Sequence, residues 1–285
     1  MSKHSLLLIG CGDLGQRVGK SLAPEGWHIN AVRRTPPVAQ DDFEWIAADY
    51  SVPGALDFAQ ALRPDIVLAS FTPTAMDVAG YRRGFTRAAA NVLSGLGTHR
   101  PTHLFMVSST RVYAEQDGGW VDEHSPLSTS DERAMAIIDA EQQVLKSGLS
   151  ASVVRFGGVY GDPHGRLLNR IRAGQITPAA PVRFTNRIHR DDCAGFLVHL
   201  IRLAMGEQQL APVYNGVDND PAPAHEVERW IATTLGCDIS NPAPPPRQPA
   251  GHKRCRNTLL RASGYELLYP DYRAGYAAVC REAQR

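Results

Sequence analysis

The stretch LLLIGCGDLGQRVGKSLA, residues 6–23, decides the fold of this chain of 285 residues. An apolar run over residues 6–9 is followed by Gly10, Gly12 and Gly15, which have the spacing G-x-G-x-x-G, and then by a helical pattern up to residue 23. The apolar run predicts a buried strand, and the glycines permit a tight turn that leads directly into the helix. We therefore expect a strand–turn–helix unit that opens a parallel sheet.

A turn of this kind is suited to bind the pyrophosphate of a dinucleotide. Its glycines let the backbone approach the phosphates, and the helix N-terminus offers N–H groups and a partial positive charge. The alternative is an ordinary tight turn that happens to contain three glycines. The first interpretation predicts cofactor contacts at Gly10, Gly12, Asp13, Leu14 and Gly15.

The second strand, expected at residues 27–32, indicates which dinucleotide is bound. A site for NAD usually has an acidic residue about twenty positions after the glycines, where it binds the ribose hydroxyls. Here the sequence is NAVRRTPP, residues 30–37, with Arg33 and Arg34, and the next carboxylate is Asp41. A guanidinium binds a 2′-phosphate through two hydrogen bonds. The sequence therefore favours NADP over NAD, with a solvated basic loop as the alternative.

Short apolar runs alternate with helical patterns along the first half of the chain. We expect further strands at residues 47–49 (the end of a short strand), 65–69, 104–107 and 152–156, and helices at residues 55–62, 81–96 and 134–147. Alternation at this spacing predicts an α/β fold, a Rossmann-type doubly wound parallel sheet with helices on both faces.

The pattern changes after residue 156. We expect residues 1–156 to form the NAD(P)-binding domain and residues 157–285 to form mainly a smaller C-terminal α/β lobe that binds substrate and returns some elements to the sheet. Helices are expected there at residues 192–205 and 225–235. The proline-rich stretch NPAPPPRQPAGHK, residues 241–253, predicts a loop or crossover.

Composition narrows the function classes. The net charge is +1 and the pI is about 7.7, which gives no reason to expect a nucleic acid or a membrane surface as partner. The five cysteines contain no C-x-x-C pair, and histidines show no metal-ligand spacing, so we expect a reducing compartment and no metal site. These features predict a cytoplasmic protein that binds a small molecule.

Later segments, in the expected order, carry a resemblance to a known family. They are AADY, VLASFTP, VSSTRVY, GWVDEHSPL, VVRFGGVYGDPHGRL, NRIHRDDCA, VYNGVDNDP and KRCRNTLLRASGYELLYPDYRAGY. With the glycine loop they resemble the extended short-chain dehydrogenase/reductase family, and within it the NAD-dependent epimerase/dehydratase group, over nearly the whole chain. A methyltransferase would share the glycine loop but not these segments.

The resemblance implies a carbonyl or alcohol substrate, such as a nucleotide sugar, and a homodimer formed through the helices at residues 81–96 and 134–147. It implies that Ser109 orients the reacting oxygen. Arg187 and Arg254 would face anionic groups of the substrate, although a salt bridge or a surface position would also explain them. Further cofactor contacts are implied at Asp49, Ser70, Phe71, Thr72, Ser108 and Gly157.

The chain departs from the family at the acid–base pair. The family has a tyrosine followed one helical turn later by a lysine, whereas alignment on Glu141 places Arg133 and Ile137 at these positions. A positioned acid–base group contributes roughly 10²–10⁴-fold in rate. Tyr113 is chemically the best replacement, although it would also suit a packing role. We therefore expect an NAD(P)-binding oxidoreductase or epimerase, with an inactive NAD(P)-binding sensor or scaffold as the alternative.

Overall fold

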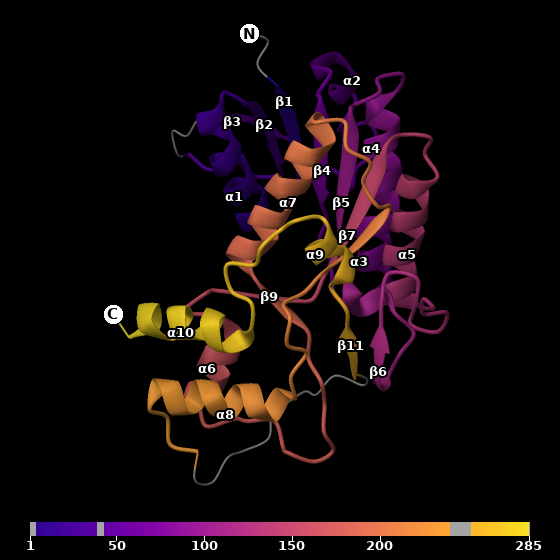
Figure 1. Cartoon of the computed structure of the whole chain (residues 1–285). Coiled ribbons are helices and arrows are strands. Elements are labelled where there is room, and N and C mark those ends of the chain that lie inside the picture. Colours follow the sequence, from indigo (N-terminus) through magenta and orange to yellow (C-terminus); the bar gives the residue numbers. More distant parts are fainter. Residues whose placement is uncertain (1–3, 39–42, 240–251, 285) are drawn as a thin grey trace. The chain divides into compact units, whose positions relative to one another are not determined.

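The computed structural model describes residues 4–38, 43–239 and 252–284, and Asp41 and most of the proline-rich stretch lie outside these residues. The chain forms two compact units (Figure 1). Unit 1 contains Met1–Val112, Leu127–Arg155 and Ala194–Tyr214, and unit 2 contains Tyr113–Pro126, Phe156–Cys193 and Asn215–Arg285. That residues 157–285 serve as a substrate lobe stays a prediction.

A seven-stranded sheet, in the order β10-β7-β5-β4-β1-β2-β3, organises unit 1, although the last residue of β7 and the last two residues of β10 are assigned to unit 2. The neighbouring pairs β1–β2, β2–β3, β1–β4 and β4–β5 all run parallel. The order reverses beside β1, and such a switch point is where open parallel sheets bind ligands. The strands are β1 Ser5–Ile9, β2 His28–Arg33, β3 Phe43–Ala47, β4 Ile66–Ser70, β5 His103–Ser109, β7 Ala151–Phe156 and β10 Val213–Gly216.

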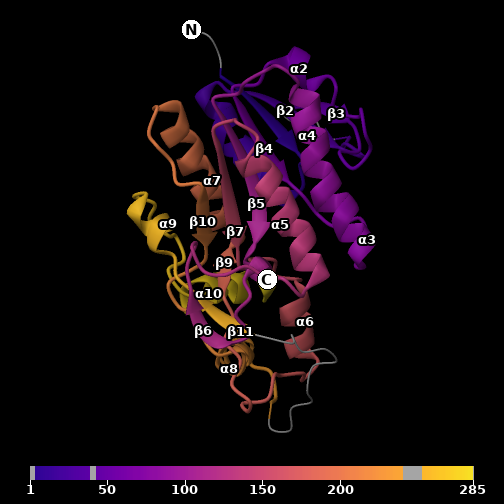
Figure 2. The ribbon, with the colours of Figure 1, turned by 90° about the vertical axis from the view of Figure 1, so that its right-hand side faces the viewer.

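Helices cover both faces of this sheet, as predicted. Helices α4 and α5 lie on one face and α7 lies on the other, which is clearest when the sheet is seen from the side (Figure 2). Residues 6–9 of β1 are therefore apolar throughout and at most 1% exposed, because a strand covered on both faces has no side open to water. The helices are α1 Asp13–Leu22, α2 Ala59–Leu62, α3 Val78–Tyr81, α4 Ala88–Leu96, α5 Glu132–Leu145 and α7 Arg190–Met205, with a π-helical segment at Arg82–Arg87.

Unit 2 contains two small parallel sheets and a helical core. Strand β6 Asp117–Val121 pairs with β11 His252–Cys255, and β8 Gly158–Tyr160 pairs with β9 Arg187–His189. The core is formed by apolar side chains of α6 Arg166–Arg172, α8 Ala224–Leu235 and α10 Tyr272–Ala283. The short helix α9 Thr258–Ala262 completes the unit.

Most element boundaries differ from the sequence predictions by one to four residues, and the helix expected at residues 55–62 is reduced to α2 at Ala59–Leu62. Two of the differences have a clear local cause. Strand β3 ends at Ala47, whereas we expected a strand end at residues 47–49, because the chain turns there: the Asp49 carboxylate accepts hydrogen bonds from the backbone N–H and hydroxyl of Ser51. The helix expected at residues 81–96 begins at Val78, where Asp77 caps it by accepting a hydrogen bond from the Gly80 N–H.

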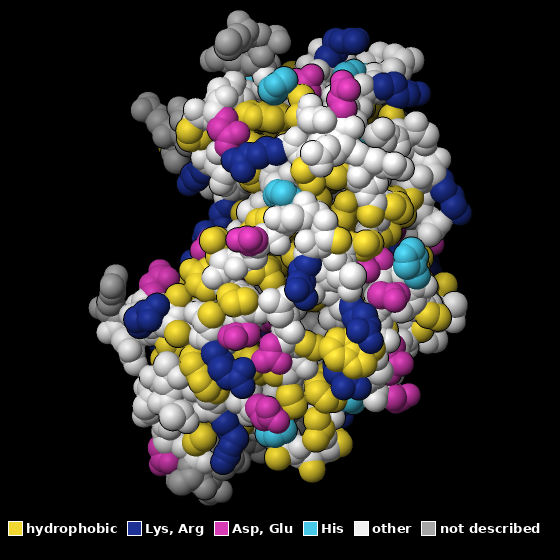
Figure 3. Space-filling view, in the orientation of Figure 1, with side chains coloured by type: hydrophobic (Ala, Val, Ile, Leu, Met, Phe, Trp, Pro, Cys, Tyr) yellow, Lys and Arg dark blue, Asp and Glu magenta, His cyan; other side chains and the backbone are white. Residues whose placement is uncertain are grey.

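The surface carries charges of both signs. On the face shown in Figure 3, Lys and Arg side chains of the described residues are interspersed with Asp and Glu side chains. This face therefore presents no broad basic surface of the kind that binds nucleic acids.

Candidate functional site

A pocket of about 400 Å³ lies in unit 1, where β1, β2 and β4 end. It brings together residues that the sequence analysis assigned to the cofactor from three separate stretches of the chain. Only backbone and side chains of unit 1 contribute to it. Its lining residues are Gly10, Cys11, Gly12, Asp13, Leu14, Arg33, Arg34, Thr35, Tyr50, Ser70 and Thr72.

The three glycines of the loop have three different roles. Gly10 has a φ of +80°, and a Cβ there would lie 2.2 Å from the Ser70 carbonyl oxygen, so only glycine fits. Gly15 does not line the pocket; a Cβ there would lie 3.2 Å from the sulfur of Cys11, so it lets α1 pack on the loop. Gly12 caps α1 without a side chain, and a Cβ there would meet nothing within 4 Å.

The N-terminus of α1 therefore fits a phosphate group. Gly12 supplies no side chain to cap the first turn, so the N–H groups of that turn are left for a ligand. The open space beside Gly12 is what an approaching pyrophosphate needs. The uncapped first turn and the open space beside Gly12 are both expected of a loop that binds a dinucleotide.

Arg33 and Arg34 stand at the end of β2, and both are exposed and line the pocket. Within the described residues, neither guanidinium forms a hydrogen bond or an ion pair with another side chain. In the part of the chain that the structure describes, these two unpaired cations therefore lie beside the glycine loop, and guanidinium groups of this kind pair well with phosphates.

Tyr50 and Thr35 are pocket residues that the sequence analysis missed. The Tyr50 hydroxyl accepts a hydrogen bond from the Thr72 backbone N–H at 3.1 Å, which joins the loop after β3 to the loop after β4. The ring of Tyr50 lies 5.3 Å from the ring of Phe71, which is itself buried and does not line the pocket. Asp49 does not line it either. The signal for Tyr50 was its place directly after Asp49 in AADY.

The hydroxyls at the end of β5 divide into a buried one and a more accessible one. Ser108 is buried, and its hydroxyl donates a hydrogen bond of 2.5 Å to Glu141, which also binds the guanidinium of Arg155 at 2.6 Å. The cofactor contact predicted for Ser108 is therefore corrected to a structural role. Ser109 is half-buried, and its oxygen accepts a hydrogen bond from the Arg111 N–H at 3.2 Å. In that bond the hydroxyl is the acceptor, so its proton is not used.

Replacement of Ser108 tests this assignment. Ser108→Ala removes one donor from a buried carboxylate, so we expect the free energy of unfolding to fall by about 1–3 kcal/mol, while the affinity for NADPH is unchanged. Urea denaturation and NADPH titration measure the two effects. Ser109→Ala is the matched control for stability. If Ser108→Ala had normal stability but weak NADPH affinity, the structural role would be wrong and Ser108 would contact the cofactor.

Tyr113 is wrong as the replacement for the missing tyrosine. Its side chain is 0% exposed, and its hydroxyl donates a hydrogen bond of 2.6 Å to Asn215, also in unit 2. A fully buried hydroxyl with this bond is a packing group that no substrate reaches. Of the two positions aligned with the family's acid–base pair, Ile137 is buried in α5 and Arg133 contacts a tyrosine that the sequence analysis overlooked. The ring centre of this residue, Tyr81, lies 6.0 Å from the guanidinium of Arg133 and 5.9 Å from that of Arg111.

The predicted residues of unit 2 do not gather around one pocket. The Arg254 Nε donates to the Gly118 carbonyl at 2.8 Å, and its guanidinium lies 4.6 Å from the ring centre of Phe184. A Cβ at Gly157 would lie 3.0 Å from the backbone of Asn186, so neighbouring backbone already explains that glycine. Arg187 lines a separate cavity of unit 2.

Among the described residues there is neither a helix able to span a membrane nor a cluster of metal-ligating side chains. None of the helices in residues 4–38, 43–239 and 252–284 combines the length and apolar character needed to cross a bilayer. In the same residues, no three histidine, cysteine, aspartate or glutamate side chains come together as metal ligands would.

Comparison with known proteins agrees with the geometry of the pocket. The sequence model of a family described as NAD(P)H-binding matches residues 10–203. A structure from Methylobacillus flagellatus, assigned as an NAD-dependent epimerase/dehydratase, is 32% identical with a TM-score of 0.85, and all of both chains is covered. A Streptomyces protein named 3-diazoavenalumate denitrifying reductase is 25% identical over 83% of this chain and 81% of its own length.

A human epimerase family protein solved with NADPH shares the fold, with a TM-score of 0.76, 19% identity and coverage of 98% of this chain and 99% of its own. The resemblance to NAD-dependent epimerases and dehydratases predicted from the sequence is thus confirmed, as is the Rossmann-type fold. The chain belongs to the NAD(P)H-binding family and, within it, to the proteins of the NAD-dependent epimerase/dehydratase type.

Proposed function

We propose that this protein is an NADPH-dependent reductase that acts on a small organic molecule. The observation that supports this most is the pair Arg33 and Arg34, two exposed guanidiniums without a partner among the described residues, beside the glycine loop. NADP carries a phosphate where NAD has a hydroxyl, and paired guanidiniums would bind that group.

The residues of the pocket fit this cofactor. The first turn of α1 would hold the pyrophosphate, Arg33 and Arg34 would hold the 2′-phosphate, and Tyr50 would lie against the adenosine part. When bound, NADPH supplies a hydride. Ser109 would donate a hydrogen bond to the substrate atom that gains negative charge, and the proton that its bond with Arg111 leaves over suits this role.

Reduction agrees better with these residues than epimerisation does. An epimerase must first remove a proton from an alcohol, which needs a base. On the alignment at Glu141, Arg133 and Ile137 would occupy the family's acid–base positions, and Tyr113 is buried. A guanidinium does not lose its proton in a protein. A reduction can instead end with a proton taken from water. The name of the Streptomyces relative, a reductase, favours the same direction.

Substrate turnover tests the proposal. Full-length protein is mixed with NADPH and with aldehydes, ketones, quinones, aromatic diazo acids and nucleotide sugars, and the loss of NADPH absorbance is followed. We expect turnover with at least one class, and a fall in kcat of about 10²–10³-fold in Ser109→Ala, the usual loss when one donor to a developing anion is removed. Near-normal turnover by this variant would show that Ser109 does not donate to the substrate in the reaction.

A second candidate is an NAD(P)-binding sensor without catalysis, which the substituted acid–base positions favour. Tight NADPH binding with no turnover of any substrate class would support it over the reductase. Thermal melting reports binding independently of turnover, because a ligand that binds only the folded state raises the melting temperature.

The cellular location and the oligomeric state of the protein are proposals as well, the first from the composition and the second from the resemblance to the family. We place the protein in the cytoplasm, and we propose a homodimer formed through the layer of α4 and α5. Light scattering of the full-length protein measures the mass in solution: twice the chain mass of 31.1 kDa supports the dimer, and a single chain mass rejects it.

A further inference from the structure

Unit 2 contains a cavity of about 550 Å³ that the cofactor site does not use. Its walls come from β8, β9, α6 and α8, together with Tyr276 of α10, and all of these residues belong to unit 2. Small-molecule sites commonly have volumes of roughly 300–1,000 Å³. The cavity is therefore large enough for an organic ligand.

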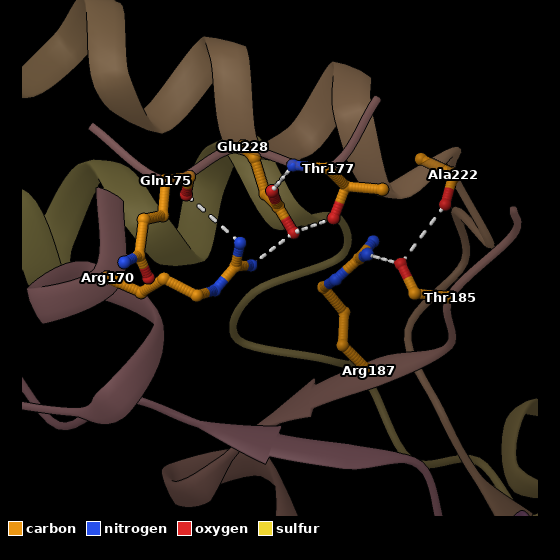
Figure 4. A network of polar contacts seen from close by, with 7 residues as sticks. All are labelled: Arg170, Gln175, Thr177, Thr185, Arg187, Ala222 and Glu228. Atoms are coloured by element: carbon orange, nitrogen blue, oxygen red, sulfur yellow. Dashed lines mark hydrogen bonds and ion pairs between the residues drawn. The ribbon is translucent and has the colours of Figure 1, made fainter. Parts of the chain in front are cut away.

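A buried arginine lines this cavity with one side of its guanidinium unsatisfied. Arg187 is only 6% exposed, and its Nη2 donates to the hydroxyl of Thr185 (Figure 4). Its Nη1 is buried and has no hydrogen-bond partner among the described residues. A buried cationic nitrogen without a partner is costly, so the free side of Arg187 is a favourable place for an anion that enters the cavity.

The nearby glutamate does not neutralise Arg187. Glu228 also lines the cavity, but its carboxylate is held by Arg170 at 2.5 Å and by the backbone N–H and hydroxyl of Thr177 at 2.6 and 3.0 Å. Figure 4 shows these bonds on one side of the cluster and the bond between Arg187 and Thr185 on the other.

Asp218 leaves Arg187 unpaired as well. One Asp218 oxygen accepts from the Asp220 N–H at 3.1 Å, and the other is buried without a partner. Burial raises the pKa of Asp218 to about 7, even though Arg187 acts in the opposite direction. No ion pair joins Asp218 to Arg187 within the described residues.

The remaining walls of the cavity indicate which chemical group would carry the anion. Leu168 and Val227 provide an apolar surface, and the rings of Tyr160 and Tyr276 stack with their centres 4.3 Å apart. An aromatic or aliphatic body would bury apolar area against these walls.

The charges of the lining favour a monoanion. Four charged residues line the cavity, two cationic and two anionic: Asp162, Arg166, Arg187 and Glu228. A diphosphate would bring two or more negative charges towards two carboxylates, whereas a single carboxylate satisfies Arg187 with little repulsion. We propose that this cavity binds the carboxylate of an aromatic or apolar organic acid through Arg187. That the acid binds to Arg187 does not depend on the proposed function. That the bound acid is the substrate of the reductase does depend on it.

The test is a titration of pairs of ligands into full-length protein without cofactor. Benzoate, phenylacetate, cinnamate and 4-hydroxycinnamate are each compared with the corresponding amide by calorimetry. We expect at least one acid to bind at one site per chain, and about 10–100-fold more tightly than its amide, the value of a hydrogen-bonded charge pair. Equal affinity for acid and amide, or no binding of any acid, overturns the proposal.

Two variants assign the binding to Arg187. Arg187→Met should reduce the affinity for the acid to that for its amide. Thermal melting without ligand checks that the variant is folded, because the change also removes the hydrogen bond to Thr185 and the contact of the guanidinium with the Tyr272 ring, 5.5 Å from its centre. Arg166→Met, at an exposed residue of the same cavity, is the matched control and should change the affinity less than about threefold. Full affinity in Arg187→Met overturns the assignment.

Competition separates this site from a nucleotide site. Uridine diphosphate should not displace the acid, and displacement at comparable affinity would overturn the monoanion argument. Because these titrations contain no NADPH, their failure leaves the cofactor site untouched. The NADPH titrations in turn do not depend on Arg187.

Discussion

Gly12→Ala is expected to weaken NADPH binding by at least two orders of magnitude, about 10²-fold or more, and to leave the protein folded. The backbone of Gly12 has a φ of −88°, which alanine adopts without strain, and the added Cβ meets no atom within 4 Å. That open space borders the uncapped first turn of α1, so the new methyl group occupies the place that the pyrophosphate needs. Loss of two charge-assisted hydrogen bonds weakens binding by about 10²–10⁴-fold.

Titration calorimetry with NADPH and thermal melting without it measure the two halves of this prediction. Gly206→Ala is the matched control, because a Cβ there would only touch carbonyl oxygens at 3.5 Å, an ordinary contact. Gly10→Ala would be a poor test, since its Cβ would lie 2.2 Å from the Ser70 carbonyl oxygen and would disturb folding and binding together. Normal NADPH affinity in Gly12→Ala would mean that no phosphate lies at this helix.

The combined change Arg33→Ala and Arg34→Ala should remove the preference for NADPH. Each guanidinium contributes a charge-assisted pair with the 2′-phosphate, and the loss of both weakens NADPH by about 10²–10³-fold. NADH has no such phosphate, so its affinity should change by less than about threefold, the remaining effect being a long-range one that salt screens.

Calorimetry with both cofactors, at low and at physiological salt, measures this difference. Arg82→Ala combined with Arg83→Ala removes the same charge from another adjacent pair of exposed arginines, which does not line the pocket, and serves as the control. If the variant without Arg33 and Arg34 weakened NADPH and NADH equally, the 2′-phosphate assignment would be wrong and NAD would remain the cofactor of choice.

The sheet of unit 1 and the helix α8 of unit 2 could be predicted from the sequence, whereas the strands of unit 2 could not. Strands such as β1 and β4 are buried on both faces, so each appears as an uninterrupted apolar run. The strands of unit 2 lack that pattern: β6 is DGGWV, β8 is GVY with two exposed residues, and β11 is HKRC. Pairs of short strands gain their stability from contacts that a local pattern does not encode.

The site shows the same division. The glycine loop and Arg33 could be predicted because their spacing and their place after a strand are local properties. Tyr113 was misjudged because its burial depends on Asn215, 102 residues further along the chain. Arg187 was expected to face an anion, but the missing partner of its Nη1 emerges only when Thr185, Glu228 and Asp218 are placed around it.

The most direct test of the central claim is a crystal structure of the protein soaked with NADPH. We predict that pyrophosphate oxygens lie within hydrogen-bond distance of backbone N–H groups in the first turn of α1, and that the 2′-phosphate contacts Arg33 and Arg34. NADPH bound elsewhere on the chain, or an empty pocket at Gly12 under saturating NADPH, would contradict the account.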